Sequence, residues 1–146
     1  MTTQHAVDEA GIRQHIDKVV EAIRVMDLEG MTSIYAPDMV LCHVQLPLQH
    51  VGAAATWRNW SDAFTAFQRP LGIEIRNLTI TLDGDVAFAH RLNRLGTAWK
   101  NGNRSDFWVR ATYCFRKING KWLIAHHHAS VPLDLENGRA LLNLKP

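Results

Sequence analysis

Three consecutive histidines, His126, His127 and His128, are the most conspicuous chemical feature of the sequence. Because successive side chains of a β-strand point to opposite faces, His126 and His128 share one face and His127 lies on the other. A β-bulge in the strand would reverse this assignment. The outer pair could be hydrogen-bonded histidines at a dimer interface, or could serve a metal site or catalysis. The triplet therefore offers imidazoles to both sides of one strand.

Other polar residues in apolar surroundings also suit acid–base chemistry. An imidazole is a competent base near neutral pH, which makes His43 a candidate. Tyr113 lies among apolar residues and is the best candidate for a hydroxyl inside a cavity. Each residue also fits a buried, hydrogen-bonded group without chemistry, and so does His90. Three histidines could bind zinc, but nothing in their spacing requires it, and we predict no metal site.

Length, composition and charge are those of an ordinary globular domain. The chain has 146 residues, 47% hydrophobic and 21% charged, with a net charge of +2. So small a charge gives no reason to expect nucleic-acid or membrane binding, and no apolar run approaches the ~18 residues of a membrane span. Met1 to Asp8 lacks a signal-peptide pattern, and Cys42 and Cys114 cannot form a disulfide framework. We therefore expect one cytoplasmic domain over residues 1–146.

Apolar residues recur with helical spacing in the first half of the chain. Residues 8–28 carry one apolar stripe on an otherwise polar helix. Residues 29–35 predict a second, shorter helix, which Pro37 stops. A third helix is predicted over residues 53–69, ending at Pro70. Its aromatic stripe is most simply core, although part of it could form a pocket wall. The stripe consists of Trp57, Trp60, Phe64 and Phe67.

The sequence after Pro70 is typical of β-strands joined by turns. The alternation of apolar residues slips between Ile75 and Leu78, which predicts a bulge there. The order of elements indicates an α+β fold, with three helices on the concave side of a curved antiparallel sheet of about five or six strands. The interior of such a sheet is a natural place for a small-molecule pocket. Strands are expected over residues 39–44, 71–82, 86–99, 106–118 and 121–131.

Two stretches of the sequence resemble a known family. Residues 27–43, DLEGMTSIYAPDMVLCH, are similar to the helix-to-strand passage of ketosteroid isomerases. Residues 119–132, NGKWLIAHHHASVP, resemble the last hairpin of SnoaL-like proteins and of the calcium/calmodulin-dependent kinase association domain. The resemblance implies the nuclear transport factor two-like fold, a cone-shaped, barrel-like curved antiparallel sheet in which three N-terminal helices enclose a cavity. It leaves the chemistry open, because this fold carries many functions.

The resemblance also assigns positions to individual residues. His43 stands where the isomerases carry their carboxylate base. Val19 stands in place of their tyrosine donor, and Ala111-Thr112 in place of their acidic donor, so steroid isomerase activity is not predicted. By analogy with the kinase association domain, Ala129 and His127 face the cavity, as do His90 and Leu92, while His126 and His128 face outward.

The function we predict is binding of a small apolar ligand. In its enzymatic form, this function is acid–base catalysis on a bound carbonyl compound. In that form His43 is the base, His127 or Tyr113 polarises the carbonyl oxygen, and no cofactor is needed. The reaction would be an isomerisation, hydration or cyclisation. The alternative is a non-catalytic ligand-binding or dimeric assembly module, and the sequence leaves open whether the protein is an enzyme. The predicted ligand-binding residues are Trp57, Trp60, Phe64, His90, Leu92 and Ala129.

Large apolar residues on the predicted outer face of the sheet indicate an interface. An exposed apolar patch is usually covered by a partner, and two-fold dimers are the commonest solution. We therefore expect a homodimer through the outer sheet face. The residues assigned to it are Trp108, Trp122, Ile124, His126 and His128.

Overall fold

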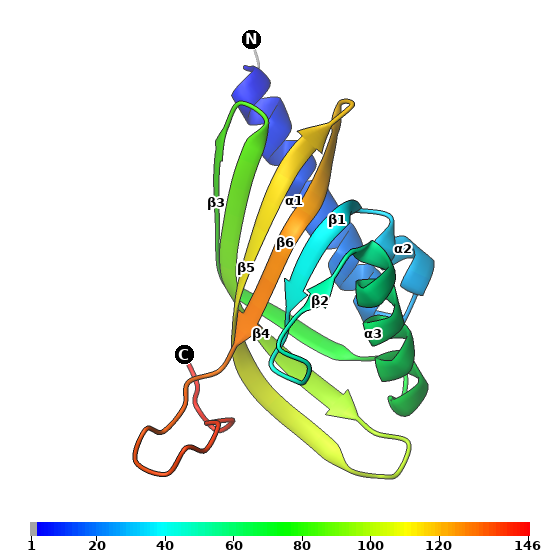
Figure 1. The fold of residues 1–146 in the computed structure, drawn as a ribbon, viewed down its shortest axis with the longest axis vertical. Coiled ribbons are helices and arrows are strands. Elements are labelled where there is room, and N and C mark those ends of the chain that lie inside the picture. Colours follow the sequence, from blue (N-terminus) through cyan, green and yellow to red (C-terminus); the bar gives the residue numbers. More distant parts are fainter. Residues whose placement is uncertain (1–2) are drawn as a thin grey trace.

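The computed structural model describes residues 3–146, which form three helices and one six-stranded sheet. Figure 1 shows the strands curving around one side of the molecule, with the helices packed against them. This confirms the predicted α+β arrangement, although the sheet does not close into a barrel. In chain order the elements are α1 (Gln4–Arg24), α2 (Leu28–Thr32), β1 (Tyr35–Cys42), β2 (His50–Val51), α3 (Ala53–Ala66), β3 (Gly72–Asp83), β4 (Val86–Ala98), β5 (Arg104–Ile118) and β6 (Lys121–Ser130).

The strand order is β2-β1-β6-β5-β4-β3. Strands β3 to β6 form the predicted antiparallel meander, and the last hairpin turns at Asn119-Gly120, where both residues have positive φ. Strand β1 pairs with β6 in parallel, an arrangement that the sequence pattern did not indicate. The bulge expected in β3 is confirmed, because its register shifts between Arg76 and Thr79 and Asn77 has a φ of 59°.

The helices begin and end at other residues than predicted, because local interactions set their ends. The Thr3 side chain accepts a hydrogen bond from the Ala6 amide, so α1 begins before residue 8. Helix α1 ends at Arg24, Met26 has a positive φ, and Asp27 caps the separate helix α2. Pro37 lies within β1 rather than ending a helix. Helix α3 is also shorter than predicted, because Phe67 is extended and pairs with Trp99.

Asp8 anchors the start of α1 to the sheet. Its carboxylate accepts a hydrogen bond from the Trp122 indole N–H at 3.2 Å and lies 2.9 Å from the Lys117 ammonium. Lys117, as the strongest influence, holds the Asp8 pKa below its usual value. One carboxylate therefore joins the first helix to the last two strands.

Replacing Asp8 by alanine should destabilise the fold, because it leaves the buried Trp122 N–H without its acceptor and Lys117 without its counter-ion. We expect a melting temperature several degrees below that of wild type in a thermal melt. Asp17→Ala is the matched control, since Asp17 is an exposed carboxylate on the same helix. Equal melting temperatures for the two variants would contradict this role for Asp8.

A bulge in β6 corrects the predicted outer face. Cys114 pairs with His126 but Phe115 pairs with Ile124, which leaves Ala125 as the extra residue. The alternation of inward and outward side chains along β6 therefore shifts by one residue at Ala125. Trp122 and Ile124, predicted to lie on the outer face, are instead buried in the core at 4% and 2% exposure.

The register of β4 corrects a second prediction. We predicted that His90 and Leu92 face the cavity, but the alternate residues, Arg91 and Asn93, are buried there. They pair with Ala111 and Val109, whose side chains lie on the inner face of β5. His90 is exposed, and Phe88 on the same side of the strand is 45% exposed. The analogy with the kinase association domain therefore assigned the wrong face of β4 to the cavity.

Within residues 3–146, no helix combines the length and the apolar character needed to cross a membrane.

Candidate functional site

A cavity of about 340 Å³ lies between α3 and the concave face of the sheet. Most of its wall is apolar and includes Trp60, Phe67 and Phe107. Backbone hydrogen bonds from Gln68 to Ala98 and from Lys100 to Ala66 tie the end of α3 to the end of β4, so the helix is held over the curved strands (Figure 1). A few polar side chains converge on this apolar space, as in typical small-molecule sites. They include His43, Arg91, Asn93, Tyr113 and His127.

Tyr113 is at the centre of the polar groups. Its hydroxyl oxygen accepts a hydrogen bond from Arg91 Nη2 at 2.8 Å and a longer one from Asn93 Nδ2 at 3.4 Å. Because both neighbours donate, the hydroxyl proton of Tyr113 is free to be donated elsewhere. A charged donor at the oxygen also polarises the O–H bond and strengthens that donation. The arrangement thus presents a hydrogen-bond donor to a ligand oxygen.

His127 stacks against the Tyr113 ring, with centroids 4.3 Å apart and an interplanar angle of 23°. Its side chain is 6% exposed, and its Nδ1 atom has no hydrogen-bond partner within residues 3–146. Burial, with the nearby His43 and Arg91, lowers the His127 pKa well below its ordinary value. His127 is therefore a neutral imidazole at physiological pH.

His43 lines the same cavity, immediately after β1. Its ring meets the Trp60 ring edge-on, with centroids 6.0 Å apart. Burial, and then the nearby His50, lower the pKa of His43. A neutral imidazole at the cavity wall can accept a proton from a bound molecule.

Arg91 is the most unusual residue of the cavity, because it is a charged side chain only 4% exposed. Its Nε and Nη1 atoms have no hydrogen-bond partner, and no carboxylate pairs with it, within the described part of the chain. The guanidinium carbon lies 4.5 Å above the Tyr113 ring. An unpaired buried charge costs several kcal/mol. A ligand oxygen with negative charge would offset that cost.

The predicted site residues fall into two groups. The cavity wall includes His43, His127, Tyr113, Trp60 and Ala129. Phe64 packs against Trp60 at 5.8 Å between ring centroids but is not part of the wall.

The remaining predicted residues lie elsewhere, or were missed. Trp57 is 45% exposed and is not part of the cavity wall, whereas His90 and Leu92 lie on the other face of β4. Arg91 and Asn93 were not predicted to line the cavity, because the alternate residues of the same strand, His90 and Leu92, were assigned to it. The signal that could have found Arg91 is the pairing of β4 with β5, which places it opposite Ala111.

The depressed pKa of His127 predicts acid destabilisation. Unfolding restores an ordinary histidine with a pKa near 6.5, so below that pH the unfolded chain binds a proton that the folded chain does not. Stability is therefore present above pH ~6.5 and is lost as the pH falls, by about 1.4 kcal/mol per pH unit for one proton. Urea unfolding between about pH 7 and 5 measures this slope, and His127→Asn should flatten it. Identical slopes for wild type and variant would contradict the burial of a neutral imidazole.

Comparison with known proteins places this fold in a family. The SnoaL-like domain model matches residues 12–134. The chain belongs to the SnoaL-like family. An NTF2-like protein of unknown function from Pseudomonas putida KT2440 is 34% identical and superposes with a TM-score of 0.88, covering 96% of this chain and 97% of that one. A comparison with curated proteins found no match.

Two further solved structures share the fold of this SnoaL-like domain. A candidate calcium/calmodulin-dependent protein kinase II association domain from Xanthomonas campestris is 25% identical, with a TM-score of 0.73 and 89% coverage of each chain. A ketosteroid isomerase-like protein from Erwinia carotovora atroseptica SCRI1043 is 20% identical, with a TM-score of 0.72, covering 83% of this chain and 93% of that one. The family resemblance drawn from residues 27–43 and 119–132 is thereby confirmed.

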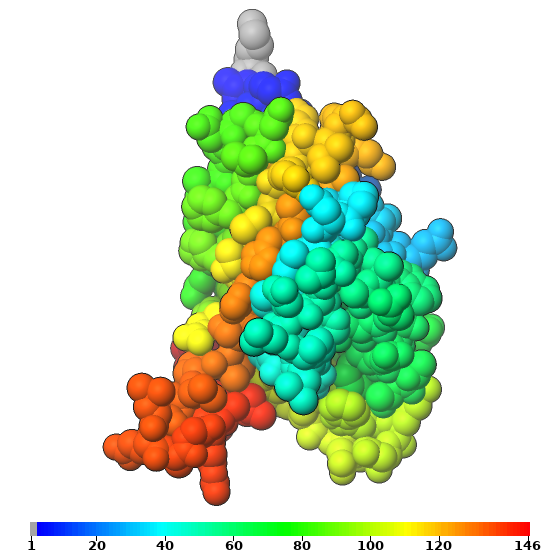
Figure 2. Space-filling model, viewed as in Figure 1, coloured from blue at the N-terminus to red at the C-terminus, as the bar shows by residue number. Residues whose placement is uncertain are grey.

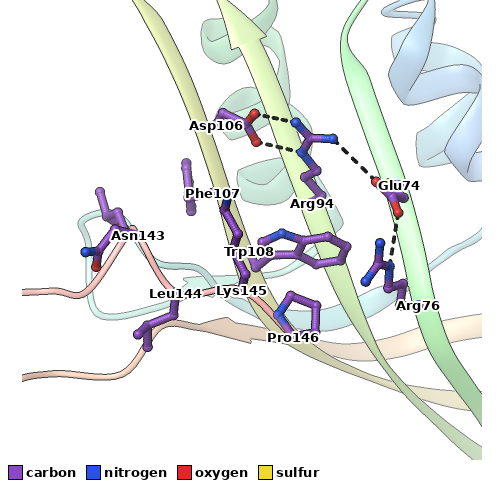
Figure 3. Close-up of a pocket in the computed structure, with 11 residues that line it drawn as sticks. Glu74, Arg76, Arg94, Asp106, Phe107, Trp108, Asn143, Leu144, Lys145 and Pro146 are labelled. Atoms are coloured by element: carbon purple, nitrogen blue, oxygen red, sulfur yellow. Dashed lines mark hydrogen bonds and ion pairs between the residues drawn. The ribbon is translucent and has the colours of Figure 1, made fainter.

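A second hollow, of about 550 Å³, lies on the other face of the SnoaL-like sheet, against the C-terminal tail (Figure 3). Figure 2 shows this tail extending from the body of the molecule. The charges that line the hollow are largely paired: Arg94 holds Asp106 with two hydrogen bonds, at 2.6 and 2.8 Å, and also contacts Glu74. Such exposed pairs contribute little to stability. The inner cavity, where a buried charge is unpaired, is the better candidate site.

Proposed function

We propose that this domain, over residues 1–146, binds a small and mostly apolar carbonyl compound in the inner cavity and transfers a proton on it without a cofactor. The observation that carries this proposal is the Tyr113 hydroxyl, which accepts from Arg91 and Asn93 inside an otherwise apolar cavity. A hydroxyl held in this way can donate to a carbonyl oxygen and strengthen that bond as the oxygen becomes negative.

His43 is the proposed base. Its imidazole removes a proton from the carbon beside the carbonyl, the C–H electron pair forms the C=C bond of an enolate, and the carbonyl oxygen takes the negative charge. The imidazolium then returns the proton to the same carbon or to another one. This sequence serves an isomerisation directly, and it begins a cyclisation or an elimination of water, the reverse of a hydration.

Two buried groups support the enolate. His127 stays neutral because of its lowered pKa, so its N–H can donate to the ligand oxygen without losing its proton to solvent. Arg91, buried and without a carboxylate partner within residues 3–146, supplies a positive charge behind the Tyr113 hydroxyl. Both groups stabilise charge that develops during the reaction rather than charge on the bound substrate.

Deuterium exchange tests this proposal without knowledge of the natural substrate. A panel of enolisable ketones, cyclic and aromatic, is incubated with the protein in D₂O, and NMR follows the loss of proton signal beside the carbonyl. We expect protein-dependent exchange for ligands whose signals also shift or broaden on binding. Ligands that bind without any exchange across the panel would overturn the enzymatic form.

A non-catalytic ligand-binding or assembly module is the second candidate. This candidate is favoured because His43 occupies the position at which ketosteroid isomerases, which the sequence resembles, carry a carboxylate base. Binding without exchange in the same experiment supports it. A cytoplasmic location is proposed with either function, in keeping with Cys42 and Cys114 as free cysteines.

We also propose that two copies associate through the outer sheet face. With Trp122 and Ile124 in the core, the proposed patch consists of Trp108, His126 and His128 together with Phe88, which is 45% exposed. Light scattering at micromolar concentration should give the mass of a dimer, and His126→Ala should lower the dimer fraction. A monomer mass for the wild-type protein would contradict this association.

A further inference from the structure

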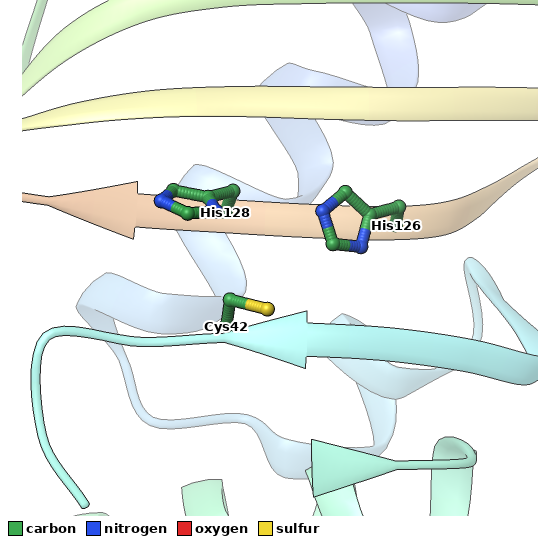
Figure 4. Close-up of side chains that lie close together, drawn as sticks. All are labelled: Cys42, His126 and His128. Atoms are coloured by element: carbon green, nitrogen blue, oxygen red, sulfur yellow. The ribbon is translucent and has the colours of Figure 1, made fainter. Parts of the chain in front are cut away.

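Cys42, His126 and His128 form a cluster on the outer face of the sheet, separate from the cavity (Figure 4). Cys42 is the last residue of β1, and the two histidines lie two residues apart on the neighbouring strand β6. In the parallel pairing of β1 with β6, Leu41 stands opposite His127. The next pair along the two strands is Cys42 opposite His128. One ligand atom of each residue lies within 4.8 Å of the other two. Three chemically reactive side chains are therefore held together by backbone pairing.

Within the described part of the chain, none of the three side chains makes a contact that occupies its ligand atom. No hydrogen bond or ion pair to their side chains occurs within residues 3–146, and Cys42 is a free cysteine. In the single chain Cys42 and His126 are half-buried and His128 is exposed, so an ion from solvent can reach the cluster, which the proposed association of two copies would then cover. The rings of His126 and His128 lie 6.3 Å apart and are tilted by 56°, which leaves space between them.

A thiolate and two imidazoles are the donor set that zinc prefers in proteins. No carboxylate belongs to the cluster, so calcium and magnesium, which require oxygen ligands, do not fit it. Ligand atoms on a tetrahedral zinc ion lie roughly 3.3–3.8 Å apart, as follows from its bond lengths of ~2.0–2.3 Å. The present separations, all within 4.8 Å, exceed that range by at most ~1.5 Å.

We infer that Cys42, His126 and His128 form a binding site for one zinc ion on the outer face of each chain. The Cys42 thiol loses its proton to the solvent as the sulfur binds the metal. Three protein ligands leave the fourth tetrahedral position to water, on the side where His128 is exposed. This site is independent of the proposed chemistry in the inner cavity, because the cluster lies on the opposite face of β6 from His127.

Titration with Co²⁺ alone tests the site, since cobalt takes the same ligands and reports on them by absorption. The full chain, reduced and free of metal, should bind one Co²⁺ per chain with a thiolate-to-cobalt charge-transfer band and tetrahedral ligand-field bands, and Zn²⁺ should abolish both. Cys42→Ser should remove the charge-transfer band. His126→Ala and His128→Ala should each weaken binding by more than about tenfold.

Two matched variants control for the other outer-face groups. Cys114 pairs with His126 from β5 but is outside the cluster, and His90 is an exposed histidine on β4. Cys114→Ser and His90→Ala should bind cobalt as the wild type does. Melting temperatures measured without metal identify any variant that fails to fold, and the exposed His128 gives a variant that tests the site without loss of core packing.

Three results would overturn the inference. The first is a folded wild-type chain that gives no charge-transfer band. The second is equal loss of the band in Cys114→Ser and Cys42→Ser. The third is half an ion per chain at saturation, which would place the ligands of one ion on two copies.

Discussion

Replacing Tyr113 by phenylalanine should slow the ketone proton exchange by roughly 10²–10³-fold, the usual effect of removing one donor to a developing oxyanion. The variant keeps the ring that stacks on His127 and loses only the hydroxyl, so the cavity keeps its shape. The loss also leaves Arg91 Nη2 without its acceptor. We therefore expect a moderate fall in stability beside the large fall in rate, measured by NMR exchange and by urea unfolding.

Tyr35→Phe is the matched control for that variant. Tyr35 is the other tyrosine of the chain, and it is also buried, at 7% exposure, but it is not part of the cavity wall. Its hydroxyl should be dispensable for exchange. If Tyr113→Phe retained the wild-type rate, the Tyr113 hydroxyl would not be the donor to the carbonyl oxygen.

The second large effect is expected for His43→Ala, which removes the proposed base. General-base catalysis contributes about 10²–10⁴-fold, and exchange in this variant should fall by that amount. The fold should remain intact, because His43 follows β1 and its side chain forms no hydrogen bond or ion pair within residues 3–146. Added imidazole should restore part of the rate by entering the space that the ring leaves.

His90→Ala controls for the removal of a histidine as such, because His90 is exposed on the other face of β4. Its exchange rate should equal that of the wild type. A full rate for His43→Ala, with a large loss for His127→Asn, would assign the base to His127 instead.

The sequence predicts the elements of this fold well where one face of each element is buried. The apolar stripe of α1 and the turn at Asn119-Gly120 identify their elements from local residue types alone. The assignment of His43 and Tyr113 to one cavity combined strand alternation with the resemblance to the isomerases, and both residues line the cavity. Such local patterns predict the folded structure correctly because the local preference of each segment agrees with the tertiary structure.

The errors arise where facing depends on non-local pairing. A one-residue change in register moves every side chain of a strand to the other face. The extra residue Ala125 does this within β6, where Trp122 and His127 both reach the interior although their positions differ by an odd number. Arg91 was missed because the analogy with the kinase association domain assigned the other face of β4 to the cavity, and only the pairing of Arg91 with Ala111 of β5 identifies the inner face.

The parallel pairing of β1 with β6 determines when, during synthesis, the sheet of this protein can be completed. Leu41 stands opposite His127, so most of the chain must be synthesised before the two strands can meet. Closing so long a loop costs entropy that only the completed sheet repays, and sheets dominated by distant pairings fold slowly. A nascent chain that has released only its first helices therefore holds His43 without a cavity around it. The cavity that we propose as the ligand site is therefore complete only at the end of folding, when the final strand docks.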